Sequence, residues 1–116
     1  MKRASSLSSQ RMHQQYETEA ELLSKATAWL RPQESLGVKT LRICDMYHKG
    51  YSDLFLCVNG VFVVVELKDN TGKASLHQEV FIKDMINAGA VGGVCRSLQD
   101  IANLIERAKL QSGERG

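Results

Sequence analysis

The stretch YSDLFLCVNGVFVVVELK, residues Tyr51–Lys68, decides the expected fold of this chain. Two runs rich in β-branched and aromatic residues flank the dipeptide Asn59-Gly60, which favours a two-residue type I′ turn between antiparallel strands. Such a turn pairs Val58 with Val61, and each further pair lies one residue outward on both strands. The stretch therefore predicts a β-hairpin with a fixed register, provided that neither strand contains a bulge.

The open end of this hairpin carries ionisable side chains. Counting outward places Asp53 opposite Glu66, and alternation puts both on one face together with Lys68. Two carboxylates whose Cβ atoms lie about 4.5–5.5 Å apart repel each other, and one lysine offsets only part of that repulsion. A divalent cation held by oxygen ligands would supply the missing charge. The pairing indicates a Mg²⁺ or Mn²⁺ site; a structural ion-pair cluster is the alternative on residue types alone.

Length and composition indicate one soluble domain. The chain has 116 residues, of which 43% are hydrophobic and 24% charged, and its net charge of +2 does not by itself indicate nucleic-acid binding. No run approaches the roughly 18 apolar residues of a membrane span, and the N-terminus lacks the apolar region of a secretion signal. Three widely spaced cysteines in apolar runs predict reduced, buried thiols and no zinc site. We expect a cytoplasmic protein with neither a membrane nor a small-molecule partner.

Hydrophobic periodicity and capping signals predict the order of elements. The expected segments are a disordered basic arm (1–13), a helix (14–30) ended by Pro32, a strand (36–44), the hairpin, a helix (76–89), a short strand within AVGGVCR, a helix (98–109) and a frayed tail (111–116). Residues 14–110 form the single expected domain. The order α-β-β-β-α-β-α predicts a small α/β fold with a mixed four-stranded sheet flanked by helices. Its first three strands are antiparallel, and the fourth lies parallel to the third after a helical crossover.

The charged residues resemble a known nuclease signature. Asp53 followed by Glu66-Leu67-Lys68 is similar to the PD-(D/E)xK motif. Around it stand GYSDL (50–54), VVVELK (63–68), GKxSxxQ (72–78) and INAGA (86–90). This ensemble resembles the VRR-NUC family, which includes the nuclease domain of the Fanconi-associated nuclease and small stand-alone phage and bacterial enzymes. The resemblance spans about residues 19–105, departs from the signature at Ser52, where the family has Pro, and implies a restriction-endonuclease-like core.

The resemblance also implies roles for the hairpin residues. Asp53 and Glu66 would bind the catalytic Mg²⁺ or Mn²⁺, together with the main-chain carbonyl of Leu67. Lys68 would orient or deprotonate the attacking water, or neutralise the charge of the transition state.

Other residues have competing interpretations. Gln78 caps its helix from the third position after Ser75, or it points toward the metal-bound water and the phosphate as in the family. Family members carry a glutamate on the first helix that reaches the site, and Glu19 is the candidate, with Glu21 as the alternative. Both could instead complement the helix dipole.

Basic residues flank the expected site. His48 and Lys49 precede Asp53, and Lys73 follows Lys68, so we expect these three to contact DNA phosphates. The three histidines of the chain have no metal-ligand spacing and are expected at the surface.

Taken together, the resemblance implies a metal-dependent, structure-selective DNA endonuclease that hydrolyses phosphodiester bonds in branched DNA, above all four-way (Holliday) junctions and then flaps. Two symmetric cuts in a junction need two sites, which makes a homodimer the economical expectation. The alternatives are restriction-type or exonuclease activity on the same scaffold, and a non-catalytic DNA-binding module.

Overall fold

A computed structural model describes residues 7–42 and 54–115 of the chain, and side chains within 7–40 and 54–113. Its elements are α1 (Ser9–Met12), α2 (Glu19–Leu30), the 3₁₀ helix η1 (Arg31–Leu36), β1 (Val38–Arg42), β2 (Leu54–Val58), β3 (Val61–Leu67), α3 (Leu76–Asn87), β4 (Val91–Cys95) and α4 (Leu98–Arg115). No helix within these described ranges is long and apolar enough to cross a bilayer.

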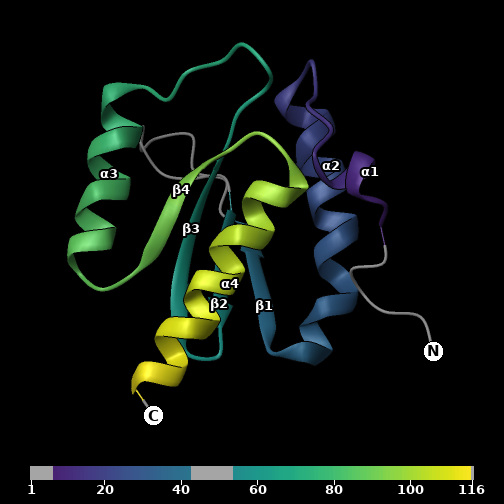
Figure 1. The fold of residues 1–116 in the computed structure, drawn as a ribbon. Coiled ribbons are helices and arrows are strands. Elements are labelled where there is room, and N and C mark those ends of the chain that lie inside the picture. The colour runs from purple at the N-terminus through teal and green to yellow at the C-terminus, as the bar shows by residue number, and fades with distance from the viewer. Residues whose placement is uncertain (1–6, 43–53, 116) are drawn as a thin grey trace.

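The four strands form one mixed sheet in the order β1-β2-β3-β4. The pairs β1–β2 and β2–β3 are antiparallel, whereas β3 and β4 are parallel and joined by the crossover helix α3. Figure 1 shows α4 crossing the sheet with α2 beside it, and α3 standing next to β4. The predicted fold class, a mixed four-stranded sheet flanked by helices, is confirmed.

The hairpin follows the predicted register. Asn59 and Gly60 have φ values of 49° and 87°, the left-handed conformation that a type I′ turn needs at both positions. Val58 pairs with Val61, and the pairing continues without a bulge as far as Leu54 opposite Val65. The next position outward is that of Asp53, which lies outside the described residues, so its pairing with Glu66 stays a prediction.

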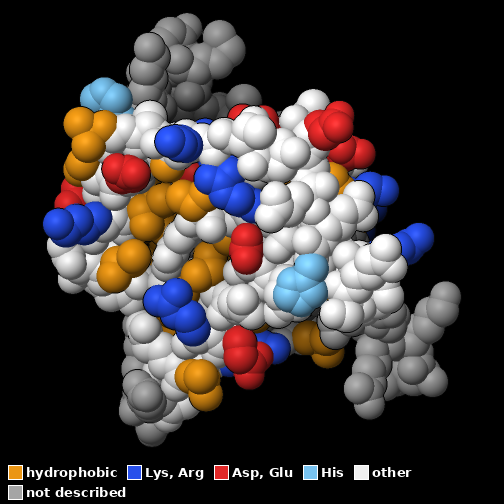
Figure 2. All heavy atoms as spheres, turned by 45° about the horizontal axis from the view of Figure 1, so that its top comes forward, with side chains coloured by type: hydrophobic (Ala, Val, Ile, Leu, Met, Phe, Trp, Pro, Cys, Tyr) orange, Lys and Arg blue, Asp and Glu red, His pale blue; other side chains and the backbone are white. Residues whose placement is uncertain are grey.

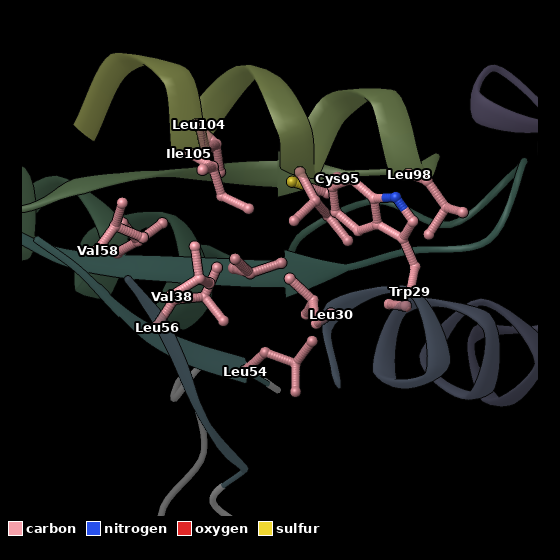
Figure 3. Packing of buried hydrophobic residues seen from close by; sticks show 14 of the residues in the cluster. Trp29, Leu30, Val38, Leu54, Leu56, Val58, Cys95, Leu98, Leu104 and Ile105 are labelled. Atoms are coloured by element: carbon pink, nitrogen blue, oxygen red, sulfur yellow. The ribbon is translucent and has the colours of Figure 1, made fainter. Parts of the chain in front are cut away.

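The side chains of β3 alternate between two buried faces. Val61, Val63, Val65 and Leu67 join a hydrophobic core between the sheet and the helices α2 and α4. Figure 3 shows this core, with Trp29 among the residues that it labels. The other face of β3 packs under α3, and this face positions the candidate site.

Two terminal segments differ from the prediction. Residues 9–12 form a helix capped by Ser8 rather than a disordered arm, because Met12 is buried in the core. The α-helix α2 begins at Glu19 and not at Gln14, because Thr18 caps its first turn by accepting a hydrogen bond from the Glu21 N–H.

The last helix is longer than the prediction. It continues to Arg115 instead of ending near Lys109 before a frayed tail. Gln111 Nε2 donates to the carbonyl of Gly89 at 2.8 Å, and Ser112 Oγ donates to the carbonyl of Asn59 at 2.9 Å. These long-range contacts hold the last turns of the helix against the rest of the domain.

The cysteine prediction is half right. Cys57 and Cys95 are both free thiols, but only Cys95 is buried, and Cys57 is exposed on β2. Cys44 lies outside the described residues. Burial, followed by the nearby charges of Asp100 and Glu66, raises the pKa of the Cys95 thiol far above its usual range.

Candidate active site

Glu66 is a buried carboxylate near the carboxyl end of β3. Strand alternation turns it away from the main core, on the same face as Val64, and its side chain is 1% exposed. Its neighbour on β4 is Val94. A buried carboxylate is stable only where hydrogen bonds and cations compensate its lost hydration, so the groups around Glu66 define the site.

Gln78 bonds to Glu66 from helix α3. Its Nε2 donates to Glu66 Oε2 at 2.9 Å. Its Oε1 accepts from the Ser75 N–H at 2.8 Å, while Ser75 Oγ accepts from the Gln78 N–H at 3.2 Å, so a full capping box is present. The two interpretations of Gln78 are therefore compatible, because the amide that caps α3 also contacts the candidate site.

Lys68 brings a cation to the same carboxylate. Its Nζ lies 3.5 Å from Glu66 Oε2 and 3.3 Å from Glu19 Oε1, and its side chain is 13% exposed. Burial lowers the pKa of Lys68, but the hydrogen bond and charge of Glu19, and then the charge of Glu66, outweigh it, so the pKa is raised overall. The ammonium is thus held as a cation between two carboxylates.

The structure distinguishes the two candidate glutamates of α2. Glu19 stands at the first turn, beside the chain that leaves β3, where the Asn70 N–H donates to the carbonyl of Tyr16 at 2.8 Å. Glu21 lines a different cavity, between α2 and the N-terminal segment. There Tyr16 has a pKa raised by burial and then by the charge of Glu21. Glu19, and not Glu21, lies at the cluster.

The loop after Lys68 is held by contacts that sequence analysis missed. Asp69 Oδ1 accepts from the N–H groups of Thr71 and Gly72, which lowers the pKa of Asp69. Arg96 Nη1 donates to the carbonyl of Asp69 at 2.6 Å. The letters DNTG carry the signal of an Asp-centred turn, but nothing local indicates the bond from Arg96, which is 27 residues away.

The remaining predicted site residues divide into two groups. Asp53, His48 and Lys49 lie outside the described residues. Leu67 directs its side chain into the main core, which leaves its main chain at the edge of the site. Lys73 is exposed in the loop between Lys68 and α3.

The donor chemistry of the cluster fits a hard divalent cation. Within residues 7–42 and 54–115, no three Asp, Glu, His or Cys side chains gather closely enough to form a metal site. Glu66 and Glu19 nevertheless supply carboxylate oxygens, the ligands that Mg²⁺ prefers. With the ammonium of Lys68, these two carboxylates give a formal charge of −1, and Asp53 at its predicted position would make it −2. A dication would balance that charge.

Comparison with known proteins is consistent with this geometry. The chain matches no protein-family model and no curated protein. A solved structure described as a VRR_NUC domain superimposes with a TM-score of 0.59 and 27% sequence identity, covering 76% of this chain and 94% of that one. The chain is therefore similar in fold and in sequence to a VRR_NUC domain, which confirms the resemblance that its motifs predicted.

Proposed function

We propose that this protein is a metal-dependent nuclease that hydrolyses phosphodiester bonds in DNA. The observation that carries the proposal is the buried carboxylate of Glu66, bonded at one oxygen by both Gln78 and Lys68. A purely structural strand end has no need of a buried charge, since replacing buried ion pairs by apolar residues is often neutral or stabilising. The similarity to a VRR_NUC domain supports the same conclusion.

The acidic residues would hold the metal. Asp53, Glu66 and the main-chain carbonyl of Leu67 are the proposed ligands, with Glu19 close enough to Lys68 to complete the acidic set. A bound Mg²⁺ or Mn²⁺ polarises a phosphate oxygen and lowers the pKa of a coordinated water. Glu66 is oriented for this task by Gln78, because a hydrogen bond fixes the rotation of its carboxylate.

Lys68 and Gln78 act on the reacting phosphate in this proposal. Lys68 is held as a cation within reach of Glu66, and its charge stabilises the negative charge that develops on the phosphate. Gln78 keeps its amide beside the same oxygen, where its N–H groups can also orient water. These roles favour Lys68 as an electrostatic group over Lys68 as the proton acceptor.

Branched DNA is the proposed substrate, with four-way junctions first and flaps second. A chain of 116 residues with one site offers little surface for sequence reading in its described loops. Paired cuts in a junction require two such sites, so a homodimer is part of the proposal.

A cleavage panel tests the proposal. Purified protein is incubated with Mg²⁺ or Mn²⁺ and with junction, flap, duplex and single-stranded DNA. The variants Asp53→Asn and Glu66→Gln should cut at least about 10²-fold more slowly. They should keep their affinity for DNA, measured in Ca²⁺ or EDTA.

Glu106→Gln is the matched control, because Glu106 is an exposed carboxylate on α4 away from the cluster. Unchanged cutting by Glu66→Gln would refute the site. Cutting confined to strand ends, or to one duplex sequence, would show exonuclease or restriction-type activity instead. Binding without cutting under every condition would leave a DNA-binding module.

A further inference from the structure

A groove runs along the open edge of the sheet beside the candidate site. Strand β4 has one hydrogen-bonded neighbour, β3, so its other edge faces outward between α3 and α4. The groove has a volume of about 510 Å³, and its floor is formed by Gly92, Gly93 and Val94. That volume lies within the range of sites for small ligands, so the groove fits one or two nucleotides of a single strand and not a duplex.

Cationic side chains line this groove. Lys73 and Arg96 stand at one end, and Arg107 projects from α4 further along. Figure 2 shows Lys and Arg side chains at the rim of a hollow with a hydrophobic floor. Glu79 and Asp100 also line the groove, but the carboxylate of Asp100 accepts from the Arg96 N–H at 2.8 Å.

The groove and the candidate site share a boundary. Val94 on the floor pairs with Glu66 across the parallel ladder, and the Lys68 N–H donates to the carbonyl of Cys95 at 3.0 Å. Neighbouring strands lie about 4.8 Å apart, so a chain in the groove passes within one strand spacing of the Glu66 backbone. The bond from Arg96 to the Asp69 carbonyl fixes the loop at this boundary.

The length of the groove suits a short run of phosphates. Helix α4 starts at Leu98 and turns back along β4, and Arg107 lies nine residues further on, or roughly 14 Å at 1.5 Å per residue. At about 3.4 Å of rise per nucleotide, this distance spans about four phosphates of one strand. Val94, 37% exposed on the floor, offers an apolar surface to a sugar or a base.

We infer that the groove along β4 receives the sugar-phosphate backbone of one unpaired DNA strand that leads into the active site. This inference rests on the proposed nuclease function and adds to it a strand path and a preference for branches with an unpaired arm. Lys73, Arg96 and Arg107 neutralise the phosphates, and contacts of this kind position a strand without reading its sequence.

The test measures the affinity of the full chain for two labelled DNAs in Ca²⁺ by fluorescence anisotropy. One is a nicked duplex with a single-stranded flap, and the other is the same nicked duplex without the flap. Arg107→Ala should weaken flap binding roughly two- to fivefold, the effect of an exposed ion pair. Lys73→Ala combined with Arg107→Ala should weaken it roughly tenfold and reduce the slope of log affinity against log salt by about 2. Neither variant should change binding of the unflapped duplex.

Lys109→Ala is the matched control, because it removes an exposed cation from α4 outside the groove. An equal loss for Lys109→Ala, or an equal loss on both DNAs, would overturn the inference while leaving the proposed function standing. An altered oligomeric state by sedimentation, with unchanged flap affinity, would also overturn it and assign the groove to a copy of this chain. If the wild-type protein neither binds nor cuts any DNA of the cleavage panel, the proposed function itself fails.

Discussion

The two faces of β3 are built from the same strand but do different work. Toward α2 and α4, Val63, Val65 and Leu67 are fully buried in a continuous apolar core. Toward α3, Val64 joins only a small cluster with Phe55 and Ile82, and the next residue on that face is the charged Glu66. The thin face under α3 therefore has room for polar chemistry that the thick core excludes.

The difference teaches how a chain of this size accommodates a costly site. Burying a charge next to other charges opposes folding, and the apolar face of the sheet compensates for that cost. Helix α3 packs lightly and leaves Leu76, Val80 and Ile86 exposed, but its N-terminus holds Gln78 against Glu66. Stability resides mainly on one face of the sheet and the candidate chemistry on the other.

Truncations on the two faces should differ in their cost. Leu56→Ala, in the main core, should lower the free energy of unfolding by about 2–5 kcal/mol because it leaves a cavity in a rigid environment. Ile82→Ala, under α3, should cost about 2 kcal/mol at most, because the partly exposed neighbours Phe81 and Met85 can relax. Urea denaturation measures both, and equal costs would contradict the assignment of stability to the main core.

Removing the cation of the cluster should affect both activity and stability. Lys68→Met should slow cleavage by about 10²–10³-fold and destabilise the fold by roughly 3 kcal/mol, because it leaves the buried carboxylate of Glu66 without its lysine. The double variant Lys68→Met/Glu66→Gln should recover most of that stability but none of the activity. Thermal denaturation and single-turnover cleavage separate the two effects. A double variant no more stable than Lys68→Met would show that the two charges are not coupled.

Weakening the capping box tests the link between α3 and the site. Ser75→Ala should cost about 1 kcal/mol of stability, the usual effect of losing an N-cap. It should also slow cleavage roughly tenfold, because Gln78 then holds Glu66 less firmly.

Ser75→Thr keeps the capping hydroxyl and should restore both the stability and the cleavage rate. A loss of stability without any loss of cleavage would limit the capping box to a structural role.

The smallest effect is expected at the thiols. In the native protein at pH 8, iodoacetamide should modify the exposed Cys57 and spare Cys95, whose pKa is raised by burial. Peptide mass mapping identifies the modified residue, and modification of Cys57 should leave cleavage unchanged because β2 carries it away from the cluster. Rapid modification of Cys95 would mean that the core between the sheet and α4 opens easily.

Local chemistry made much of this protein predictable from its sequence. The Asn59-Gly60 turn fixes the register of the hairpin because few residues adopt its left-handed backbone, and alternation then assigns each side chain to a face. The capping box of Ser75 and Gln78 is likewise readable, since both residues lie within one turn of a helix. These features depend on residues that are close together in the chain.

Tertiary structure decided what depends on distant residues. Whether Glu19 or Glu21 meets Lys68 depends on how α2 is placed against the end of β3, because periodicity gives a helix its apolar face but not its position. The contacts of Gln111 and Ser112 with distant carbonyls extend α4 through a segment whose composition alone predicts fraying. The groove of β4 likewise exists only because α3 and α4 pack on opposite faces of the sheet, an arrangement set by the free energy of burying the core.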